Sequence, residues 1–599
     1  MAYTTLNEVF LDRTDAEHAS RIYLHHKPFR DQPYKQITNG QFRQMVEGFS
    51  SGLHSLGVGR GDRIALISEN RPEWMVTDFA SLVIGAITVP MFPTLTAKQV
   101  EHIISHSGAK YAIVSNDLQL SKVVKSASAC PSLEGVIIMN ELWNHDTGSL
   151  KVYRFAEVAK MNTDDAFDFE KELSLAQPED TITIIYTSGT TGEPKGVMLT
   201  HGNIISNIEG ALAGLPIVGG NDVFLSFLPL SHGFERLASY LKFRSGSEVA
   251  YAESIDTVAD NMLEIRPTIM TGVPRFFEKI FSRLMRMREQ MPPLRRKIFD
   301  WAMKIGNECA VALEGGHPKK SALLFRPIAD ALVLHKIRAR TGGRVRFFVS
   351  GGAALGAEVG RAFAGFGMMI IEGYGMTETS PVIAITPSEK IKWGYVGKPL
   401  TNIEVKIASD GEILTRGPHV MKGYYHSPEM TAEIIDSEGW LHTGDIGELD
   451  SESYLRITDR KKHLIVTEGG KNVAPGPIEQ LITSSDLIDQ IIVIGDRRMF
   501  CSALVVPNFE ILAEKMGEKL KDLSPQDIVM RQDVRELISK EIDSLQKELS
   551  SYERVRRFGL LAEPFTVENG MMTPTLKVKR KEVETRYSEL IDSLYKDIK

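Results

Sequence analysis

The chain has 599 residues, of which 43% are apolar and 25% are charged, and its formal net charge is −7. This ordinary globular composition excludes a mainly disordered chain, and the length predicts two or more domains. The mildly acidic balance gives no reason to expect a nucleic-acid partner. Three widely separated cysteines, Cys130, Cys309 and Cys501, exclude a disulfide framework and favour a reducing, cytoplasmic environment.

The first 180 residues alternate helical and strand patterns, which is typical of an α/β domain with largely parallel sheets. Apolar residues at helical spacing predict a helix over 42–56, and residues 63–67 and 111–115 have the pattern of short buried strands. The longest apolar stretch, 79–92, is shorter than the roughly 20 residues that a membrane span needs. We therefore expect it to be a buried core segment with a break at Pro90. The N-terminus lacks the pattern of a signal peptide, so we expect a protein that is soluble or at most bound to a membrane surface.

An apolar strand over 181–186 leads into a loop of hydroxyls, glycines and one lysine, TSGTTGEPKG. Small residues let the backbone approach a ligand, and its N–H groups together with a cation suit the oxygens of a polyphosphate. The loop is not a Walker A motif, because Pro194 precedes the lysine and Gly196 follows it. The sequence predicts a phosphate site here, with a flexible surface turn as the alternative; its residues are Thr187, Ser188, Gly189, Thr190, Thr191, Gly192 and Lys195.

Residues 275–346 are strongly basic, with 17 Lys and Arg against 6 Asp and Glu, a balance of +11. Within them, residues 283–306 mix these cations with Met, Leu, Ile, Phe and Trp. A basic amphipathic helix of this kind can lie on an anionic membrane surface. A solvated helical face over the domain core and a dimer contact are the alternatives.

The sequence pattern changes after residue 458. Apolar strand-like runs at 490–494 and 503–506 are followed by a charged helical stretch over 510–550. We expect a small separate α/β domain that begins near Asp459.

The run at 184–203 resembles the phosphate-binding signature of the adenylate-forming, or AMP-binding, enzymes. Other segments resemble further motifs of that superfamily, in its order: LPLSHGFER at 228–236, VSGGAAL at 349–355, EGYGMTETSP at 372–381, GWLHTGDIG at 439–447, DRKKHLIVTEGGKNVAP at 459–475 and TPTLKVKRK at 573–581. The HGFER, TETSP and TLKVKRK forms and the basic insertion are most similar to long-chain fatty acyl-CoA synthetases.

The resemblance implies an α/β fold with a large N-terminal adenylate-forming domain over 1–458, built from two parallel-type sheets with helices and a small β-subdomain. Residues 275–346 would be a basic helical insertion, and 459–599 a small mobile C-terminal α/β domain with its hinge at Asp459. The implied reaction joins a fatty acid to ATP and then to coenzyme A, giving acyl-CoA, AMP and diphosphate through acyl-AMP, with Mg²⁺ bound. A ligase for medium-chain or aryl acids, a fatty acyl-AMP ligase that loads a carrier protein, and an inactive membrane-associated regulator are the alternatives.

The resemblance also implies roles for single residues. Thr187 and Glu378 would bind Mg²⁺, and Lys577, His232 and Lys195 would take part in catalysis. The implied nucleotide contacts are Gly351, Gly352, Glu372, Gly373, Tyr374, Gly375, Thr377, Asp445 and Arg460, with Tyr374 on adenine and the last two at the ribose. Gly469 and Gly470 would face CoA. Structural alternatives remain for several of these residues: a core tyrosine at 374, a surface carboxylate at 378, a structural histidine at 232, a turn-capping aspartate at 445 and a solvated basic run at 577–581. For partners, we expect small-molecule substrates, peripheral contact of 283–306 with the inner face of a membrane, or a homodimer.

Overall fold

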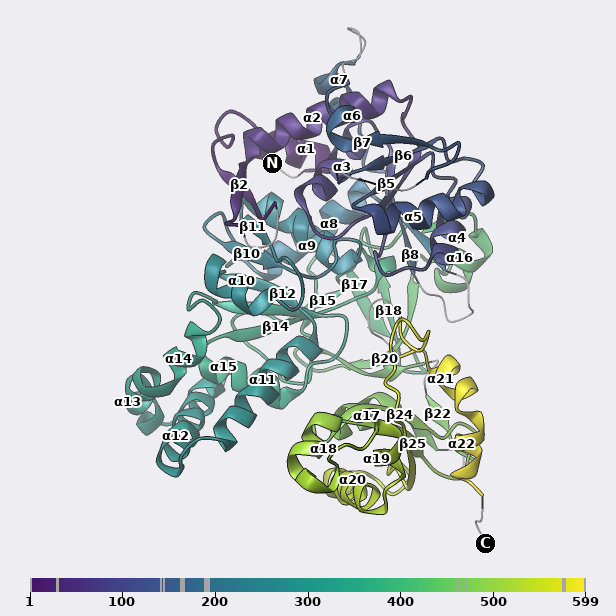
Figure 1. The fold of residues 1–599 in the computed structure, drawn as a ribbon. Helices are drawn as coiled ribbons and strands as arrows, with labels where there is room; N and C mark the ends of the chain where they lie inside the picture. Colours follow the sequence, from purple (N-terminus) through teal and green to yellow (C-terminus); the bar gives the residue numbers. More distant parts are fainter. Residues whose placement is uncertain are drawn as a thin grey trace. The chain divides into compact units, whose positions relative to one another are not determined.

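The computed structural model describes residues 3–28, 32–140, 143, 146–161, 167–187, 194–461, 464–468, 471–573 and 578–596. The chain forms two compact units, which Figure 1 colours along the sequence. Unit 1 comprises Met1–Lys406, Leu414–Thr443 and Leu449–Arg456. Unit 2 comprises Ile407–Ile413, Gly444–Glu448 and Ile457–Lys599.

The first sheet of unit 1 has eight strands in the order β19-β9-β8-β4-β3-β5-β6-β7. Their bounds are β3 (Arg63–Ile67), β4 (Ile87–Met91), β5 (Tyr111–Val114), β6 (Gly135–Ile138), β7 (Lys151–Arg154), β8 (Thr181–Thr187), β9 (Lys195–Thr200) and β19 (Gly423–Tyr424). The strands from β8 to β7 are parallel, and β9 and β19 add an antiparallel edge. The strands predicted at 63–67 and 111–115 are β3 and β5. The break predicted at Pro90 is wrong, because Pro90 lies inside β4 as the partner of Leu66.

The second sheet has nine strands in the order β16-β15-β14-β13-β12-β10-β11-β1-β2. Their bounds are β1 (Ile22–His26), β2 (Lys35–Thr38), β10 (Val223–Ser226), β11 (Glu248–Tyr251), β12 (Ile269–Gly272), β13 (Phe347–Gly351), β14 (Met369–Tyr374), β15 (Ala384–Ile385) and β16 (Lys398–Pro399). The strands from β14 to β1 are parallel, and antiparallel strands close both edges. The parallel centre agrees with the alternating pattern of the sequence.

Helices fill the space between the two sheets and cover their outer faces. The shared core lies between the sheets and contains β3 residues such as Leu66 and β10 residues such as Phe224. Its helices are α1 (Leu6–Arg13), α2 (Asn39–Ser55), α3 (Pro72–Val83), α8 (His201–Gly214) and α9 (Gly233–Ser245). Because successive strand residues point to opposite faces, Ala65 and Leu225 belong to separate outer cores. Unit 1 is therefore built as alternating helix and sheet layers, and α2 corresponds to the helix predicted over 42–56.

Two groups of helices form the outer layers. The eight-stranded sheet is covered by α4 (Ala97–Ser107) and α5 (Asp117–Ser126), and the nine-stranded sheet by α10 (Val258–Ile265), α11 (Pro274–Glu289), α12 (Pro293–Ala310) and α15 (Ala357–Phe366). The basic segment continues into α13 (Lys320–Ala329), the π-helical turn η3 (Asp330–Leu334) and α14 (His335–Ala339). Shorter helices are α6 (Phe155–Val158), α7 (Phe169–Ser174) and α16 (Pro428–Ile434).

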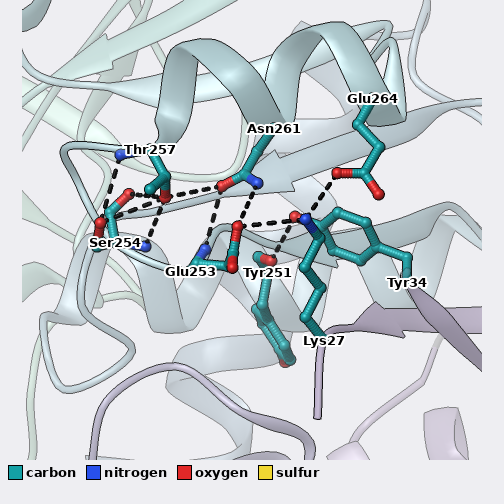
Figure 2. A network of polar contacts seen from close by, with 8 residues as sticks. All are labelled: Lys27, Tyr34, Tyr251, Glu253, Ser254, Thr257, Asn261 and Glu264. Carbon is teal, nitrogen blue, oxygen red and sulfur yellow. Dashed lines mark hydrogen bonds and ion pairs between the residues drawn. The ribbon is translucent and has the colours of Figure 1, made fainter. Parts of the chain in front are cut away.

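Figure 2 shows how polar contacts fasten α10 to the ends of β1 and β11. The Lys27 ammonium forms ion pairs with Glu253 at 3.3 Å and with Glu264 at 2.7 Å. The Tyr34 hydroxyl donates to the carbonyl of Tyr251 at 3.0 Å. The Lys27 ammonium thus has two carboxylate partners, and the network links α10 to the residues that follow β1 and β11.

The chain passes between the units within the four-stranded sheet β17-β18-β20-β21. Its strands are β17 (Glu404–Ile407), β18 (Glu412–Arg416), β20 (Leu441–Leu449) and β21 (Leu455–Arg460). Unit 2 also contains the short pair β22 (Ile465–Val466) and β23 (Asn472–Val473), and the sheet β24 (Ile488–Ile494), β25 (Ser502–Pro507) and β26 (Arg557–Leu560). Both faces of the latter sheet are covered by apolar cores, which involve α17 (Pro475–Ile482), α18 (Phe509–Met516), α19 (Pro525–Met530), α20 (Gln532–Leu545), α21 (Arg580–Arg586) and α22 (Ser588–Ser593).

Among the helices that the structure describes, none combines the length and the apolar character required to cross a membrane.

Candidate active site

The β8–β9 hairpin brings the two ends of the predicted phosphate loop together. Thr187 is the last residue of β8 and is the antiparallel partner of Lys195, the first residue of β9. β8 is buried along most of its length, which anchors the loop to the core. Ser188, Gly189, Thr190, Thr191 and Gly192 lie outside the described residues. The hairpin therefore places the residue that carries a hydroxyl, Thr187, at the start of the loop and the cationic Lys195 beside it at the end of the loop.

Glu378 lies beside this hairpin because the segment around β19 bridges them. Tyr424 of β19 pairs with Val197 of β9, and its hydroxyl donates to the Glu378 carboxylate at 2.8 Å. The Met421 N–H donates to the Glu378 carbonyl at 2.9 Å. The Lys195 ammonium lies 4.9 Å from the centre of the Tyr424 ring. Lys195, Tyr424 and Glu378 therefore form one continuous polar arrangement next to Thr187.

Tyr424 is a site residue that sequence reasoning missed. Burial raises the pKa of its hydroxyl, and the adjacent Glu378 carboxylate raises it further. The phenol consequently stays protonated and remains a hydrogen-bond donor to Glu378. Its only trace in the sequence is its place in the run GYY at 423–425, and that run alone does not distinguish it from a core tyrosine.

The predicted adenine residues lie at the carboxyl ends of β13 and β14. These neighbouring strands are parallel, and Gly351 is the partner of Gly373. Tyr374 ends β14 and its side chain is almost fully buried. At Gly375, an added Cβ would lie 1.8 Å from the Pro381 carbonyl oxygen, so only glycine fits. Gly352 has φ +86°, a left-handed conformation that favours glycine.

Glu372 is the buried acid of this strand end. Its carboxylate accepts a hydrogen bond from the Leu355 N–H at 3.2 Å. Burial raises the pKa of Glu372 from 4.5 to about 7, against the lowering effect of that hydrogen bond. A carboxyl group with such a pKa is protonated in an appreciable fraction of molecules near neutrality.

His232 is the N-cap residue that precedes α9, and the first turn of this helix lies close to the segments that carry Ile185 and Thr377. Its Nδ1 accepts from the Phe234 N–H at 3.2 Å, so the imidazole caps the helix. An added Cβ at Gly233 would lie 3.8 Å from Ile185 of β8 and 3.9 Å from the Thr377 hydroxyl. The Phe234 ring approaches Gly351 more closely still, at 3.2 Å from the position of an added Cβ.

A small cavity of about 10 Å³, roughly the space that one water needs, lies where these motifs meet. Its lining includes Thr183, Ile185, Gly233, Arg236 and Thr377. The first turn of α9 therefore lies between the phosphate hairpin and the segment that carries Glu378.

Two buried ion pairs involve α9, and neither was predicted: one joins α9 to α3, and the other lies within α9 itself. Arg236 pairs with Asp78 of α3, and Lys242 pairs with Glu235 at 2.5 Å. The Tyr240 hydroxyl also donates to Asp78, at 2.5 Å. Each of these charged side chains is at most 3% exposed, so their electrostatic interactions are strong.

The predicted ribose residues lie within unit 2. Asp445 of β20 accepts a hydrogen bond from Nε of Arg460 of β21 at 2.8 Å. The Asp445 side chain is only 6% exposed, whereas that of Arg460 is 46% exposed. Burial raises the pKa of the neighbouring Asp459 carboxyl. Asp445 and Arg460, both predicted to contact the ribose, are thus hydrogen-bonded to each other. Gly469, Gly470 and Lys577 lie outside the described residues.

Comparison with known proteins identifies the family. The AMP-binding enzyme family matches residues 11–425, and the AMP-binding enzyme C-terminal domain matches residues 462–599. The chain belongs to the AMP-binding enzyme family. This AMP-binding enzyme is 34% identical to the long-chain-fatty-acid–CoA ligase FadD15 of Mycobacterium bovis, over 96% of its own length and 94% of the relative's. It is 30% identical to fatty acyl-CoA synthetase A of Dictyostelium discoideum, over 94% and 86% of the two chains.

Solved structures establish the fold of this AMP-binding enzyme. It matches the adenylation domain of a carboxylate reductase from Mycobacterium chelonae with a TM-score of 0.76, at 22% identity over 99% of its own chain and 91% of the other. It also matches the O-succinylbenzoate CoA synthetase MenE of Bacillus subtilis in complex with ATP and magnesium ion, with a TM-score of 0.68 at 20% identity over 96% and 99%. The predicted α/β fold with a large N-terminal and a small C-terminal part is confirmed.

Proposed function

We propose that this AMP-binding enzyme is a long-chain fatty acid–CoA ligase, which converts ATP, a fatty acid and CoA into acyl-CoA, AMP and diphosphate. The observation that carries the proposal is the arrangement of Lys195, Tyr424 and Glu378 beside Thr187. The near full-length similarity to curated long-chain fatty acid–CoA ligases and fatty acyl-CoA synthetases supports the choice of substrates.

The first half-reaction joins two anions, so the site must neutralise charge around the α-phosphate of ATP. Lys195 supplies a cation at the mouth of the phosphate loop, and the residues implied for the metal, Thr187 and Glu378, offer a hydroxyl and a carboxylate. Oxygen donors of these two kinds fit Mg²⁺, which binds few protein ligands together with substrate phosphates. When bound, Mg²⁺ would offset phosphate charge in this half-reaction. The Tyr424 hydroxyl holds the Glu378 carboxylate in one orientation.

The second half-reaction uses the thiol of CoA, so the protein needs no nucleophile of its own. Two of the three cysteines are buried thiols: burial raises the pKa of Cys130, and it raises that of Cys501 to about 11. Both thiols therefore stay protonated and unreactive at neutral pH.

We further propose that unit 2 carries Lys577 into the adenylation step and presents Gly469 and Gly470 to CoA after a rotation at Asp459. Such a rotation would keep water away from the reactive acyl-AMP between the two steps. The assignments to His232, Tyr374, Asp445 and Arg460 likewise remain predictions, as do membrane contact through 283–306, a homodimer and a cytoplasmic location.

The proposal is tested by measuring diphosphate release with a series of fatty acids from acetate to arachidate, with and without CoA. We expect the highest kcat/KM for long chains, and AMP with acyl-CoA as products when CoA is present. Preference for short or aryl acids would favour another acyl-CoA ligase, and release of acyl-AMP to a carrier protein in place of CoA would favour an acyl-AMP ligase. Formation of ADP would refute adenylation altogether.

A further inference from the structure

The outward face of α13 and η3 is apolar. Leu324 is 72% exposed, Leu323 54%, Ile328 49%, Leu332 46% and Phe325 42%. Leu324 and Ile328 are four residues apart and therefore lie along one line of the helix. We refer to these five residues as the α13 surface.

The inward face of α13 has the opposite character. Ala322 and Ala329 are buried and seven residues apart, so they form a second line of small side chains that packs into the outer core beside α12. The contact to α12 includes an edge-on approach of the Phe325 and Trp301 rings at 6.2 Å. A soluble amphipathic helix normally buries its large apolar residues and exposes polar ones. In α13 the small residues are buried and the large ones face solvent.

Most of the large apolar residues in 283–306, the stretch predicted to contact a membrane, pack against the rest of the protein. Leu284, Phe299 and Ala302 are buried in the outer core, and Trp301 packs partly against it. Leu294 is the strongly exposed large aliphatic residue in this stretch. The exposed apolar surface of the basic segment is therefore concentrated about thirty residues further along the chain than the sequence pattern indicated.

Cations flank the α13 surface on both sides. Lys320 precedes it, and Lys336 and Arg340 follow it, all exposed, while the exposed Lys319 is paired with Glu308 of α12 at 2.9 Å. The acidic residue within this stretch, Asp330, is paired with Arg338 at 2.7 Å. The α13 surface thus combines apolar side chains with a positive border, in an enzyme of negative net charge.

We propose that the α13 surface binds the surface of an anionic phospholipid bilayer. The large aliphatic side chains would enter the boundary between headgroups and acyl chains, and the flanking lysines would lie at the level of the lipid phosphates. A second copy of this chain is the less favourable occupant, because a symmetric contact through the same surface would bring the two positive borders together. In Figure 1 the α12–α14 region forms an outer end of unit 1, away from the sheets.

The test is co-sedimentation of the full-length enzyme with vesicles of phosphatidylcholine alone or mixed with phosphatidylglycerol. We expect binding to the mixed vesicles that weakens with added salt. The double variant Leu324→Glu/Ile328→Glu should lower the partition coefficient at least about 10-fold. The variant Lys320→Gln/Lys336→Gln should lower it roughly fivefold for each charge removed.

Matched controls place the same substitutions on other exposed positions. Leu118→Glu/Met530→Glu replaces side chains that are 63% and 85% exposed, and Lys515→Gln/Lys540→Gln removes two exposed lysines of unit 2. Both controls should bind vesicles like the wild type. Sedimentation velocity without vesicles reports the oligomeric state of each variant.

Three results would overturn the proposal: no binding of the wild type to anionic vesicles, equal binding of the wild type and the α13 variants, or equal losses in the controls. A wild-type dimer that becomes monomeric with Leu324→Glu/Ile328→Glu would also overturn it, in favour of a subunit interface. Because all substituted residues are exposed, unchanged thermal unfolding midpoints are expected throughout.

Discussion

The substitution Tyr424→Phe tests whether the hydrogen bond to Glu378 matters for adenylation. It removes one hydroxyl and keeps the ring that lies beneath Lys195. The lost bond is 2.8 Å long and buried, and its acceptor is a carboxylate. Such bonds contribute about 1.5–3 kcal/mol, which corresponds to roughly a 10- to 100-fold lower kcat/KM for acyl-AMP formation.

The assay is diphosphate release at varied Mg²⁺ concentration. If Tyr424 orients a metal-binding carboxylate, Tyr424→Phe should also raise the Mg²⁺ concentration needed for half-maximal rate. The control is Tyr425→Phe, because the neighbouring hydroxyl makes only a 3.5 Å contact to the Ser107 carbonyl. Unchanged kcat/KM and Mg²⁺ dependence in Tyr424→Phe would refute the role assigned to this contact.

Three further outcomes are expected. Lys577→Ala should slow acyl-AMP formation about 10²–10³-fold and leave the conversion of supplied acyl-AMP to acyl-CoA nearly unchanged; equal losses in both steps would contradict the division of labour. Glu372 has its pKa raised to about 7, so folding favours its protonated form and the free energy of unfolding falls as pH rises from about 4.5 to 7. Glu372→Gln should therefore be about 3 kcal/mol more stable than the wild type at pH 8 and similar to it below pH 4.5, by urea titration. Asp78→Asn leaves the Arg236 charge buried without its counter-ion and should cost about 3–5 kcal/mol, whereas Asp180→Asn, in an exposed pair, should cost less than about 1 kcal/mol.

The parts of the fold that follow local rules were predictable. β3 and β5 are short apolar runs bounded by polar residues, and buried strands of this kind are visible in one sequence. Pro90 was misjudged because a local rule treats proline as a strand breaker, while β4 accommodates it inside a parallel sheet.

Contacts between distant residues were not predictable in the same way. Tyr424 depends on pairing between β19 and β9, whose residues are more than 200 positions apart. Asp78 lies next to an apolar stretch, and its partner Arg236 is 158 residues away. The exposed face of α13 was missed because a hydrophobic pattern locates apolar residues without telling which of them the neighbouring helices cover.

Unit 2 is built from three separate stretches of the chain, and this affects where the enzyme can be cut into fragments and the order in which parts of the unit are synthesised. Unit 2 takes residues 407–413 and 444–448 from the middle of the chain, and unit 1 reaches Arg456. A cut at the predicted boundary before Asp459 would leave Asp445 on one polypeptide and its hydrogen-bond partner Arg460 on the other. During synthesis from the N-terminus, residues 407–413 leave the ribosome long before most of the unit that they join. A fragment 459–599 expressed alone would therefore lack two strand segments of its own unit, whereas one that begins at 407 would retain them.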